Sequence, residues 1–343
     1  CYLRRAGTNW SRRLLVRAPI ALDAMGGDYG PEVAVRGAAR VVNEGIDLVL
    51  VGDKAQLEPI MATLELNVPI VHASEVIGMT DDPARALREK KDASVLVAAK
   101  LVASGDVGGF VSTGSTGASM AAAAFVIGRL KGISRPGVAS LFPHGPILLD
   151  AGANTQVRPE HLVQFAIMGS ALAEIHPGLD SPRVGLLNIG GEDSKGRDLE
   201  KETLALLREV PGINFIGNVE GTDLIGDRVD VFVTDGFTGN VVLKTAEAVS
   251  RLIFGLVSKT IIDLGISDVE QVQGALGQLA NRLAVDENGG APLLGIKGVV
   301  VVAHGSSNAS AVASACRLAA EGVEHDLPGS IEAGLARMGN GTP

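Results

Sequence analysis

The fold is decided by a pattern that is plainest at Val229-Asp-Val-Phe-Val-Thr-Asp-Gly-Phe-Thr-Gly-Asn240. The apolar run Val229–Val233 enters a loop of Thr, Asp, Gly and Asn residues, and a long helical stretch follows. The same order of short apolar run, glycine-bearing loop and helix recurs five more times along the chain. The other loops are Asp23-Ala-Met-Gly-Gly-Asp28, Ser112-Thr-Gly-Ser-Thr-Gly117, Asp150-Ala-Gly-Ala-Asn154, Asn188-Ile-Gly-Gly-Glu-Asp193 and Ala303-His-Gly-Ser-Ser-Asn308.

Apolar, β-branched runs of this kind are typical of a parallel sheet whose two faces are covered by helices. The pattern therefore predicts an α/β fold with a mostly parallel sheet. Because such sheets bind ligands at the carboxyl ends of their strands, we expect the six loops to gather on one rim. Glycine lets backbone approach a ligand, and helix N-termini offer free N–H groups to an anion. A single loop could be an ordinary turn, but six together favour a phosphate-type site.

Composition excludes several classes of protein. The chain has 343 residues, 46% of them apolar, which allows one large domain or two modest ones and is too apolar for disorder. Its two cysteines exclude a disulfide framework and a cysteine-based zinc site and suggest a reducing compartment. No apolar run approaches the ~20 residues that span a bilayer. A net charge of −9 argues against nucleic-acid binding.

Several familiar site motifs are missing. The sequence has no G-x-x-x-x-G-K-[ST], no G-x-G-x-x-G after a strand and no G-x-S-x-G, which disfavours a P-loop, a dinucleotide site and a hydrolase nucleophile elbow. The six histidines lack the spacing of metal ligands, so no metal site is expected. Only His304, on a loop expected to face the ligand, is a candidate proton carrier. Cys316 is expected to be a small buried residue.

The ends of the chain differ from its middle. Residues 1–18 carry five arginines and no acidic residue, which predicts a disordered extension or a cloning remnant, with a functional basic arm as the alternative. Residues 19–335 are expected to form a single domain with a helical segment at about 250–287. Residues 336–343 are expected to be a flexible tail.

Several of these stretches closely resemble the bacterial PlsX family of phosphate acyltransferases. The resemblance covers about residues 19–325. The matching motifs are Asp23–Asp28, Asp150–Asn154, Pro159–Gly169, Arg183–Asn188, Asn214–Asn218, Thr234–Asn240, Gly289–Ala291 and His304–Ser307. It implies a three-layer α/β/α fold related to the isocitrate and isopropylmalate dehydrogenases and to phosphotransacetylase, with a helical hairpin near the interface of a homodimer.

The resemblance also implies a reaction. A long-chain acyl thioester of acyl carrier protein reacts with inorganic phosphate and gives acyl phosphate and free acyl carrier protein, without a cofactor. The acyl phosphate serves the glycerol-3-phosphate acyltransferase of phospholipid biosynthesis, a further candidate partner. Family members are cytoplasmic and contact the membrane peripherally.

By resemblance, catalysis falls on Lys195 and Asn240. Phosphate is itself the nucleophile, so the site must hold a dianion beside a thioester and stabilise the oxyanion that develops. Lys195 can supply the charge, Asn240 an amide N–H, and His304 can assist the leaving thiolate. The expected substrate-binding residues are Asp23, Gly26, Gly27, Asp28, Ser115, Thr116, Gly117, Asp150, Asn154, Asp235, Gly236, Thr238, Gly239, Gly305, Ser306 and Ser307.

Each of these residues also has an ordinary structural explanation. Lys195 could form a solvated ion pair with Glu192 or Asp193, and Asn240 could be a helix N-cap. The acidic residues of the loops are expected to cap turns and orient amides rather than bind a metal.

Acyl carrier protein is acidic, so docking needs a local positive patch on this acidic chain. The candidates are Arg85, Arg88, Lys90, Lys91, Arg129 and Lys131, which could equally form a solvated helix face. Within residues 250–287 an apolar stripe predicts dimer packing or an acyl-chain groove, with membrane attachment as the alternative.

Three rival functions remain. A phosphotransacetylase-like enzyme would use acyl-coenzyme A with similar loops. A metal- and NAD-dependent decarboxylating dehydrogenase would share the fold, and a membrane-docked scaffold would bind acyl chains without turnover.

Overall fold

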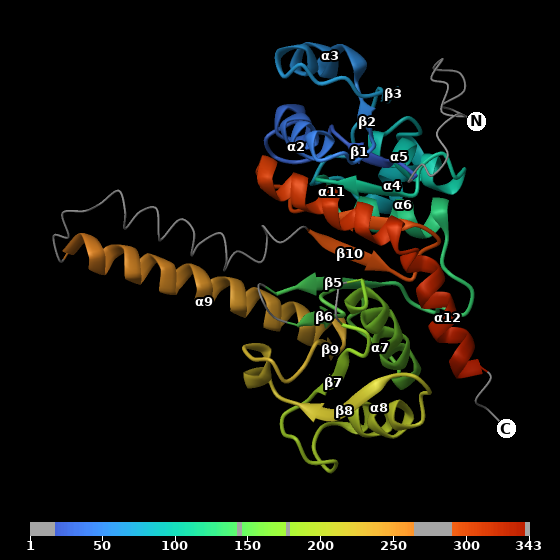
Figure 1. The fold of residues 1–343 in the computed structure, drawn as a ribbon, viewed down its shortest axis with the longest axis vertical. Helices are drawn as coiled ribbons and strands as arrows, with labels where there is room; N and C mark the ends of the chain where they lie inside the picture. The colour runs from blue at the N-terminus through green and yellow to red at the C-terminus, as the bar shows by residue number, and fades with distance from the viewer. Residues whose placement is uncertain (1–17, 143–145, 176–178, 264–289, 340–343) are drawn as a thin grey trace.

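A computed structural model describes residues 18–142, 146–175, 179–263 and 290–339 of the chain. Its described strands form one sheet in the order β3-β2-β1-β4-β11-β10-β5-β6-β9-β7-β8 (Figure 1). In chain order the strands are β1 (Ile20–Asp23), β2 (Leu48–Gly52), β3 (Ile70–His72), β4 (Gly109–Ser112), β5 (Gly137–Leu141), β6 (Ile147–Leu149), β7 (Arg183–Leu187), β8 (Asn214–Val219), β9 (Val231–Val233), β10 (Ala291–Leu294) and β11 (Val299–Val302).

The sheet has two parallel halves that run in opposite directions. β3, β2, β1, β4 and β11 are parallel neighbours, and we call them the first lobe. β6, β9, β7 and β8 are also parallel neighbours, and we call them the second lobe. Between the lobes, β11–β10, β10–β5 and β5–β6 all pair antiparallel. Three reversals in succession leave the two lobes pointing opposite ways.

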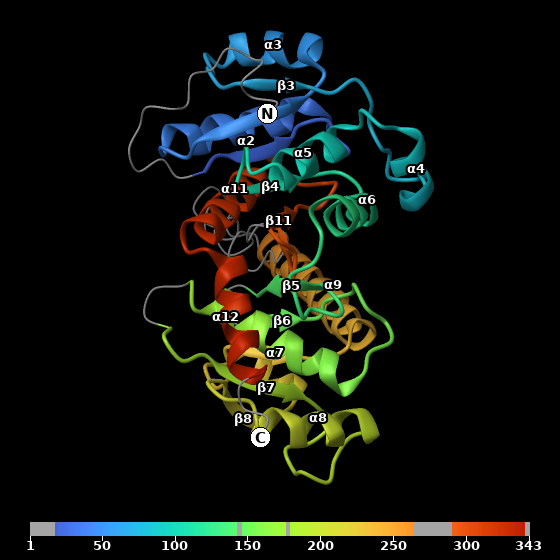
Figure 2. The ribbon, with the colours of Figure 1, turned by 90° about the vertical axis from the view of Figure 1, so that its right-hand side faces the viewer.

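Helices cover both faces of the sheet and make three layers (Figures 1 and 2). The described helices are α2 (Pro31–Asn43), α3 (Lys54–Thr63), α4 (Pro83–Glu89), α5 (Ser94–Ala103), α6 (Thr116–Ala122), α7 (Pro159–Ala173), α8 (Asp198–Arg208), α9 (Gly236–Asp263), α11 (Ala309–Glu324) and α12 (Leu327–Gly339). A π-helical turn, Ala123–Ile127, prolongs α6.

Alternate strand residues enter different apolar cores, as the two-residue period of a strand requires. In β1, Ile20 and Leu22 join the core under α2, α7 and α11, whereas Ala21 joins the core under α5 and α6. In the second lobe Leu148 lies in a third core, against which α9 packs. Strands with both faces covered need continuous apolar sequence, which is why the runs are uniformly apolar.

The expected fold class is confirmed: the structure is α/β with a large, mostly parallel sheet between helices. All six predicted apolar runs are strands, and each is followed by a helix within about 15 residues. Cys316 is fully buried, as expected. α12 continues to Gly339, past the expected start of the tail at residue 336.

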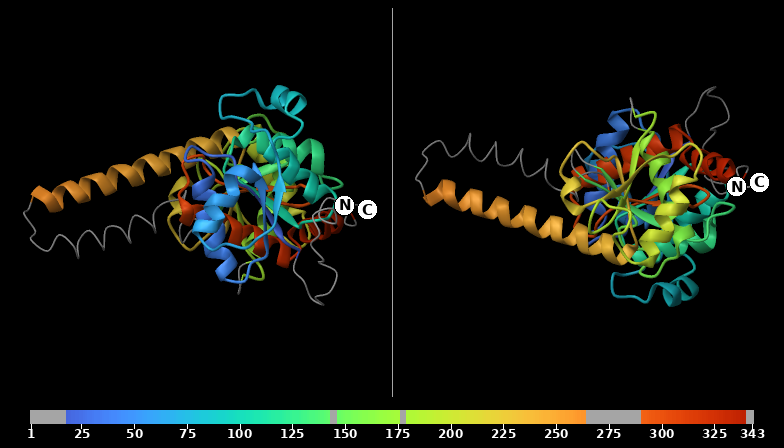
Figure 3. Two further views of the ribbon diagram at one scale, coloured as in Figure 1. Left: turned by 90° about the horizontal axis from the view of Figure 1, so that it is seen from above. Right: turned by 90° about the horizontal axis from the view of Figure 1, so that it is seen from below.

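Some expectations fall outside the described residues. These are the N-terminal extension apart from Ala18, residues 340–343 of the tail, and residues 264–287 of the helical segment. Within the described part of that segment, α9 projects from the body of the molecule (Figure 3). Its exposed side chains include Val249, Leu252, Ile253 and Leu256. Within the described ranges, no helix combines the length and apolar character that crossing a membrane requires.

Two helical glycines test the layered packing. A β-carbon at Gly169 of α7 would lie 2.5 Å from Val231 Cγ1 on β9, whereas one at Gly255 of α9 would have open space. We expect Gly169→Ala to lower the free energy of unfolding by about 1–3 kcal/mol through overpacking. Gly255→Ala should leave it unchanged or raise it by about 0.5–1 kcal/mol, because alanine favours helix. Urea unfolding measures both, and equal effects would contradict the packing of α7 on β9.

Candidate functional site

Three glycine-bearing turns of the first lobe converge at the ends of β1, β4 and β11. A β-carbon on Gly26 would lie 2.4 Å from the backbone nitrogen of Gly114, so only glycine allows this approach. Gly27 has a φ of +88° and lies against Thr113 and Gly305. The backbone N–H of Asp28 donates to the carbonyl of Gly305 at 2.8 Å. Loops nearly 300 residues apart in sequence thus form one surface of closely packed backbone.

Asp23 fixes the base of this surface. Its buried carboxylate accepts a hydrogen bond from Ser112 Oγ at 2.8 Å and one from the N–H of Met25 at 3.3 Å. Ser112 Oγ in turn accepts from the N–H of Gly114 at 3.1 Å. Burial raises the pKa of Asp23 above its usual value, although hydrogen bonds from Ser94 and Ser112 oppose the shift. A small pocket beside Asp23 is lined by Gly26, Ser94, Ser112, Ser115 and neighbouring apolar residues.

The turn after β11 orients His304. Its Nδ1 accepts from the backbone N–H of Ser306 at 3.2 Å and lies 2.6 Å from Ser306 Oγ. With Nδ1 accepting, the neutral ring carries its proton on Nε2, a tautomer assigned from the hydrogen bonds. Ser307 is buried, and its Oγ has no hydrogen-bond partner among the described residues.

In the second lobe, Asp150 organises the turn after β6. Its Oδ1 accepts from the N–H groups of Val138, Gly152 and Ala153 at 3.0–3.1 Å. Its Oδ2 accepts from the backbone and side-chain nitrogens of Asn154 at 2.7 and 2.9 Å. The side chain acts as a turn organiser, as the sequence predicted for the acidic residues of these loops.

The start of α9 packs against that turn. The N–H of Gly236 donates to the carbonyl of Asn154 at 2.8 Å. A β-carbon on Gly239 would lie 1.9 Å from the carbonyl oxygen of Asp150, so no larger residue fits there. Asn240, one residue on, lies beside Gly152, whose added β-carbon would be 3.5 Å from Asn240 Oδ1. The close approach of the two backbones therefore sets where Asn240 lies.

The N-cap of α9 is Asp235, not Asn240, which corrects the structural alternative considered for Asn240. Asp235 accepts from the N–H of Thr238 at 2.9 Å and from its Oγ1 at 2.8 Å. Asn240 lies in the second turn of the helix, and its side chain is exposed. The amide of Asn240 is thus not consumed by capping.

Arg197 joins the loop after β7 to α9. Its guanidinium donates to Asp235 Oδ2 at 3.0 Å and makes a forked pair with the buried Glu200. Burial alone would raise the pKa of Asp235, but hydrogen bonds from Thr238 and Arg197 outweigh it and hold that pKa below its usual value. The pKa of Glu200 is lowered in the same way: the bonds from Arg197 outweigh burial. Arg197 was missed in the sequence, because its partner Asp235 is distant along the chain.

Lys195 lies on the same loop with its side chain exposed. Its ammonium forms no ion pair with any carboxylate in the described part of the chain. Asp193, one of the two partners considered for it, pairs with Arg208 at 2.7 Å instead. Within the described residues Lys195 therefore forms no ion pair, which corrects the expected structural alternative.

The expected single rim also needs correction. The expected site residues divide between the two lobes. The first lobe holds Asp23, Gly26, Gly27, Asp28, Ser115, Thr116, Gly117, His304, Gly305, Ser306 and Ser307. The second lobe holds Asp150, Asn154, Lys195, Asp235, Gly236, Thr238, Gly239 and Asn240. Because the lobes run in opposite directions, their strands do not end at one edge. Among the described residues, no hydrogen bond joins Lys195 to Asn240 or to the first-lobe turns.

The turn after β4 and the start of α9 nevertheless lie on one side of the molecule. Figures 2 and 3 show α6, which follows the turn after β4, and the start of α9 on the same side. Ala118 of α6 belongs to the apolar core that also contains Ala151, and Leu243 of α9 packs against this core. Accumulated sheet twist accounts for this, because each strand step rotates the next strand by about 20–25°.

The expected docking residues fall into two places. α4 packs beside α6, where a β-carbon on Gly117 would lie 2.8 Å from Pro83 Cγ. On or just after α4, Arg85 pairs with Glu89 and Lys90 with Asp81. Arg88 and Lys91 are exposed and form no ion pair with described residues. Arg129 pairs by backbone with Ile296 near the end of β10, and exposed Lys131 follows it.

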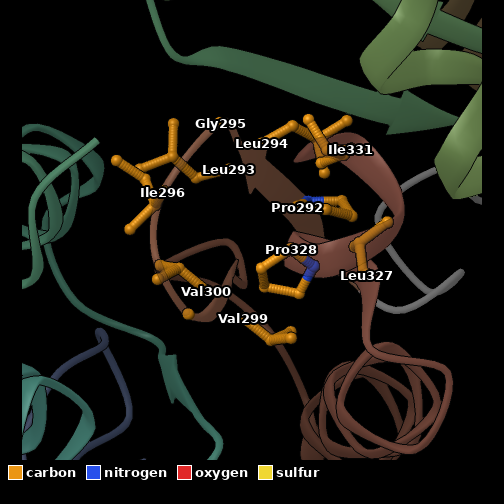
Figure 4. Close-up of a pocket in the computed structure, with 11 residues that line it drawn as sticks. Pro292, Leu293, Leu294, Gly295, Ile296, Val299, Val300, Leu327, Pro328 and Ile331 are labelled. Carbon is orange, nitrogen blue, oxygen red and sulfur yellow. The ribbon is translucent and has the colours of Figure 1, made fainter. Parts of the chain in front are cut away.

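A second pocket has different chemistry. It lies between β10, β11 and the start of α12, and Pro292, Leu293, Ile296, Val300 and Pro328 are among its lining residues (Figure 4). Its lining contains no polar side chain, so it lacks the donors that an oxyanion needs. Among the described residues no cluster of three or more His, Cys, Asp or Glu side chains is placed to hold a metal ion.

Comparison with known proteins gives a family. The family model described as "Fatty acid synthesis protein" matches residues 18–329. A phosphate acyltransferase from Desulforamulus reducens is 46% identical over 326 residues, which cover 92% of this chain and 97% of that protein.

Solved structures with low sequence identity share the fold. A phosphotransacetylase from Streptococcus pyogenes superposes with a TM-score of 0.63 at 18% identity, covering 90% of this chain and 95% of that one. A 4-hydroxythreonine-4-phosphate dehydrogenase from Klebsiella pneumoniae gives a TM-score of 0.52 at 12% identity, covering 88% and 98%. The expected relation to phosphotransacetylase and to dehydrogenase folds is confirmed at the level of fold.

Replacing Arg197 tests the bridge between the two second-lobe loops. Arg197→Met should lower the free energy of unfolding at pH 7 by about 1.5–3 kcal/mol, the range for hydrogen bonds to charged groups. Asp235 and Glu200 have depressed pKa values when folded, so the stability they contribute is present at neutral pH and is lost as the pH falls through those values. The difference in free energy of unfolding between the wild type and Arg197→Met should therefore become smaller below about pH 4.

Arg208→Met is the matched control, since the Arg208–Asp193 pair is exposed on both sides and should contribute less than about 1 kcal/mol. Denaturant unfolding from pH 3 to 8 measures all three proteins. An Arg197→Met deficit that is independent of pH would contradict the described pairing.

Proposed function

This chain belongs to the PlsX family of phosphate acyltransferases, and on that premise we propose that it transfers a long-chain acyl group from acyl carrier protein to inorganic phosphate. The products are acyl phosphate and free acyl carrier protein, for use by a glycerol-3-phosphate acyltransferase in phospholipid biosynthesis. The observation that carries the proposal is the convergence of backbone at Gly26, Gly114 and Gly305, which suits an anion.

The proposed reaction needs no enzyme nucleophile. An oxygen of hydrogen phosphate attacks the thioester carbonyl carbon and forms the new C–O bond. The tetrahedral oxyanion then collapses, the C–S bond breaks, and the proton of hydrogen phosphate ends on the leaving thiolate. The protein has to bind, orient and stabilise negative charge.

Lys195 and Asn240 are proposed to share this task. An exposed ammonium with no carboxylate partner in the described part of the chain can neutralise phosphate in the ground state and the transition state. The Asn240 amide, set by the contact between Gly239 and Asp150, can donate to phosphate or to the oxyanion. Asp150 and Asp235, which accept hydrogen bonds from their own turns, are proposed to hold these two residues in place.

His304 is proposed to assist at the leaving group. Its Nδ1 is engaged by Ser306, which leaves Nε2–H as an outward donor. A thiolate leaves readily, so this donor contributes less than Lys195. Ser306 and Ser307 share the turn, and their hydroxyls are proposed to contact substrate.

α4 is proposed to dock the acidic carrier protein. Arg88 lies on α4 and Lys91 just after it, neither forms an ion pair with described residues, and α4 packs against the start of α6, so a partner bound there is close to the first-lobe turns. Arg85, Lys90, Arg129 and Lys131 would extend the positive surface.

The assembly is part of the same proposal. We propose that residues 19–335 act as one domain in a homodimer in the cytoplasm, in peripheral contact with the membrane. The exposed apolar side chains along projecting α9 support a helical dimer contact. The hydrophobic cost of leaving such a face in water favours its burial.

Thiol release tests the reaction. Palmitoyl acyl carrier protein should yield free thiol only when phosphate is present, with acyl phosphate formed in equal amount. Palmitoyl-coenzyme A should be the poorer substrate, since it lacks the protein surface that α4 would bind. Release without phosphate would contradict the proposal, and a preference for the coenzyme A thioester would favour a phosphotransacetylase-like enzyme.

Lys195→Ala tests the proposed charge. We expect turnover to fall by about 100–1000-fold, the loss typical when one stabilising donor is removed. Lys201→Ala, at an exposed site on α8, is the matched control and should remain fully active. Both proteins should unfold like the wild type, and an active Lys195→Ala enzyme would remove that lysine from the mechanism.

Charge reversal tests docking. Arg88→Glu with Lys91→Glu should raise the KM for palmitoyl acyl carrier protein by about tenfold or more, because like charges then oppose the partner. Turnover of a small acyl thioester should be unchanged. Arg40→Glu, an exposed position on α2 at the other face of the sheet, is the control. Equal loss with both substrates would point to damaged folding instead of docking.

A further inference from the structure

Asn218 is a buried polar residue near the carboxyl end of β8. Its side chain is only 3% exposed. Nδ2 donates a hydrogen bond of 2.9 Å to the carbonyl oxygen of Glu192, in the loop that carries Lys195. Oδ1 is buried and has no partner among the described residues. Asn218 therefore donates a hydrogen bond through Nδ2, whereas its Oδ1 has no partner among the described residues.

The orientation of this amide follows from its single bond. Rotating the group by half a turn would place Oδ1 against the Glu192 carbonyl, and two acceptors repel. An unpaired buried acceptor destabilises the fold, so a side chain needed only to fill volume would do better without it. The donor at Nδ2 is thus what distinguishes asparagine at this position.

The Glu192 carbonyl is also the point that holds Lys195. It accepts from the backbone N–H of Lys195 at 3.1 Å. The carbonyl oxygen of Lys195 is also held, because it accepts a hydrogen bond from Asn188 Nδ2 at 3.2 Å. Both polar backbone groups of Lys195 are therefore engaged within the turn.

The side chain of Lys195 is guided by the same turn. A β-carbon on Gly190 would lie 3.0 Å from Lys195 Cγ and 3.3 Å from Cδ, so the lysine stem runs over this glycine. Only the ammonium remains without a described ion-pair partner. A shift of the turn would move the ammonium with it.

We propose that Asn218 is a positioning residue for phosphate use: it holds the Glu192 carbonyl, which holds the Lys195 peptide and so sets the place of the ammonium. This inference rests on the proposed function of Lys195. It adds a residue that touches no substrate and acts through the lysine alone.

Two variants remove the donor in different ways. Asn218→Asp places a carboxylate oxygen against the Glu192 carbonyl, and Asn218→Leu replaces the amide by an apolar group of similar size. We expect kcat to fall and the KM for phosphate to rise, with a combined loss of about 10–100-fold in kcat/KM for phosphate, since a misplacement near 1 Å can cost about 100-fold. The KM for the acyl carrier substrate should stay within about twofold of the wild-type value.

Asn214→Asp is the matched control. Asn214 lies at the other end of β8 and likewise donates Nδ2 to a backbone carbonyl, that of Ser181 at 3.1 Å. Its loss should leave all kinetic constants unchanged. If Asn218 matters only for folding, the Asn218 variants and Asn214→Asp should differ in their unfolding midpoints but should have the same KM for phosphate.

A double variant separates this inference from the proposed function. In a Lys195→Ala background, Asn218→Leu should change the residual activity by no more than about twofold, because its effect passes through the missing lysine. Folded Asn218 variants with wild-type phosphate kinetics, an additive loss in the double variant, or failure of both variants to fold would each overturn the positioning role. Full activity of Lys195→Ala would instead overturn the role of the lysine itself.

Discussion

The second-lobe half of the site depends on one buried carboxylate, that of Asp150. It accepts hydrogen bonds from three backbone N–H groups on Val138, Gly152 and Ala153 and from both nitrogens of Asn154. A carboxylate this deeply buried is tolerable only when its lone pairs are satisfied. These hydrogen bonds fix the conformation of the turn after β6. Through its contact with Gly239, the turn fixes the position of the start of α9, which carries Asn240.

The same principle explains why an acidic chain can offer a site for phosphate. Asp150 and Asp235 are occupied by donors from their own turns, and Asp23 lies beneath the first-lobe backbone with its pKa raised by burial. Hydrogen-bond donors within their own turns thus surround the carboxylates of Asp150 and Asp235. The ammonium of Lys195 has no such partner among the described residues, so the local field at the turns differs from the net charge of the whole molecule.

Local sequence was sufficient for six of the described strands, for the helices that follow them and for the composition of the turns, because each of these depends on neighbours in the chain. It was insufficient for the direction of the lobes. That direction is set by β5 and β10, short strands outside the repeated pattern whose antiparallel pairing joins distant segments. Arg197 and Asn218 escaped notice for the same reason, since their roles exist only once their loops meet. Glycine pairs such as Gly26 and Gly114 signalled close approach, but not which backbones would meet.

We propose that the turns, Lys195 and Asn240 hold one phosphate between them. The most direct measurement is a crystal structure of the protein with inorganic phosphate, collected with an anomalously scattering phosphate analogue to locate the anion. We expect an anion within hydrogen-bond distance of Lys195 Nζ and the Asn240 side chain. An anion bound at full occupancy elsewhere, with neither residue in contact, would contradict it.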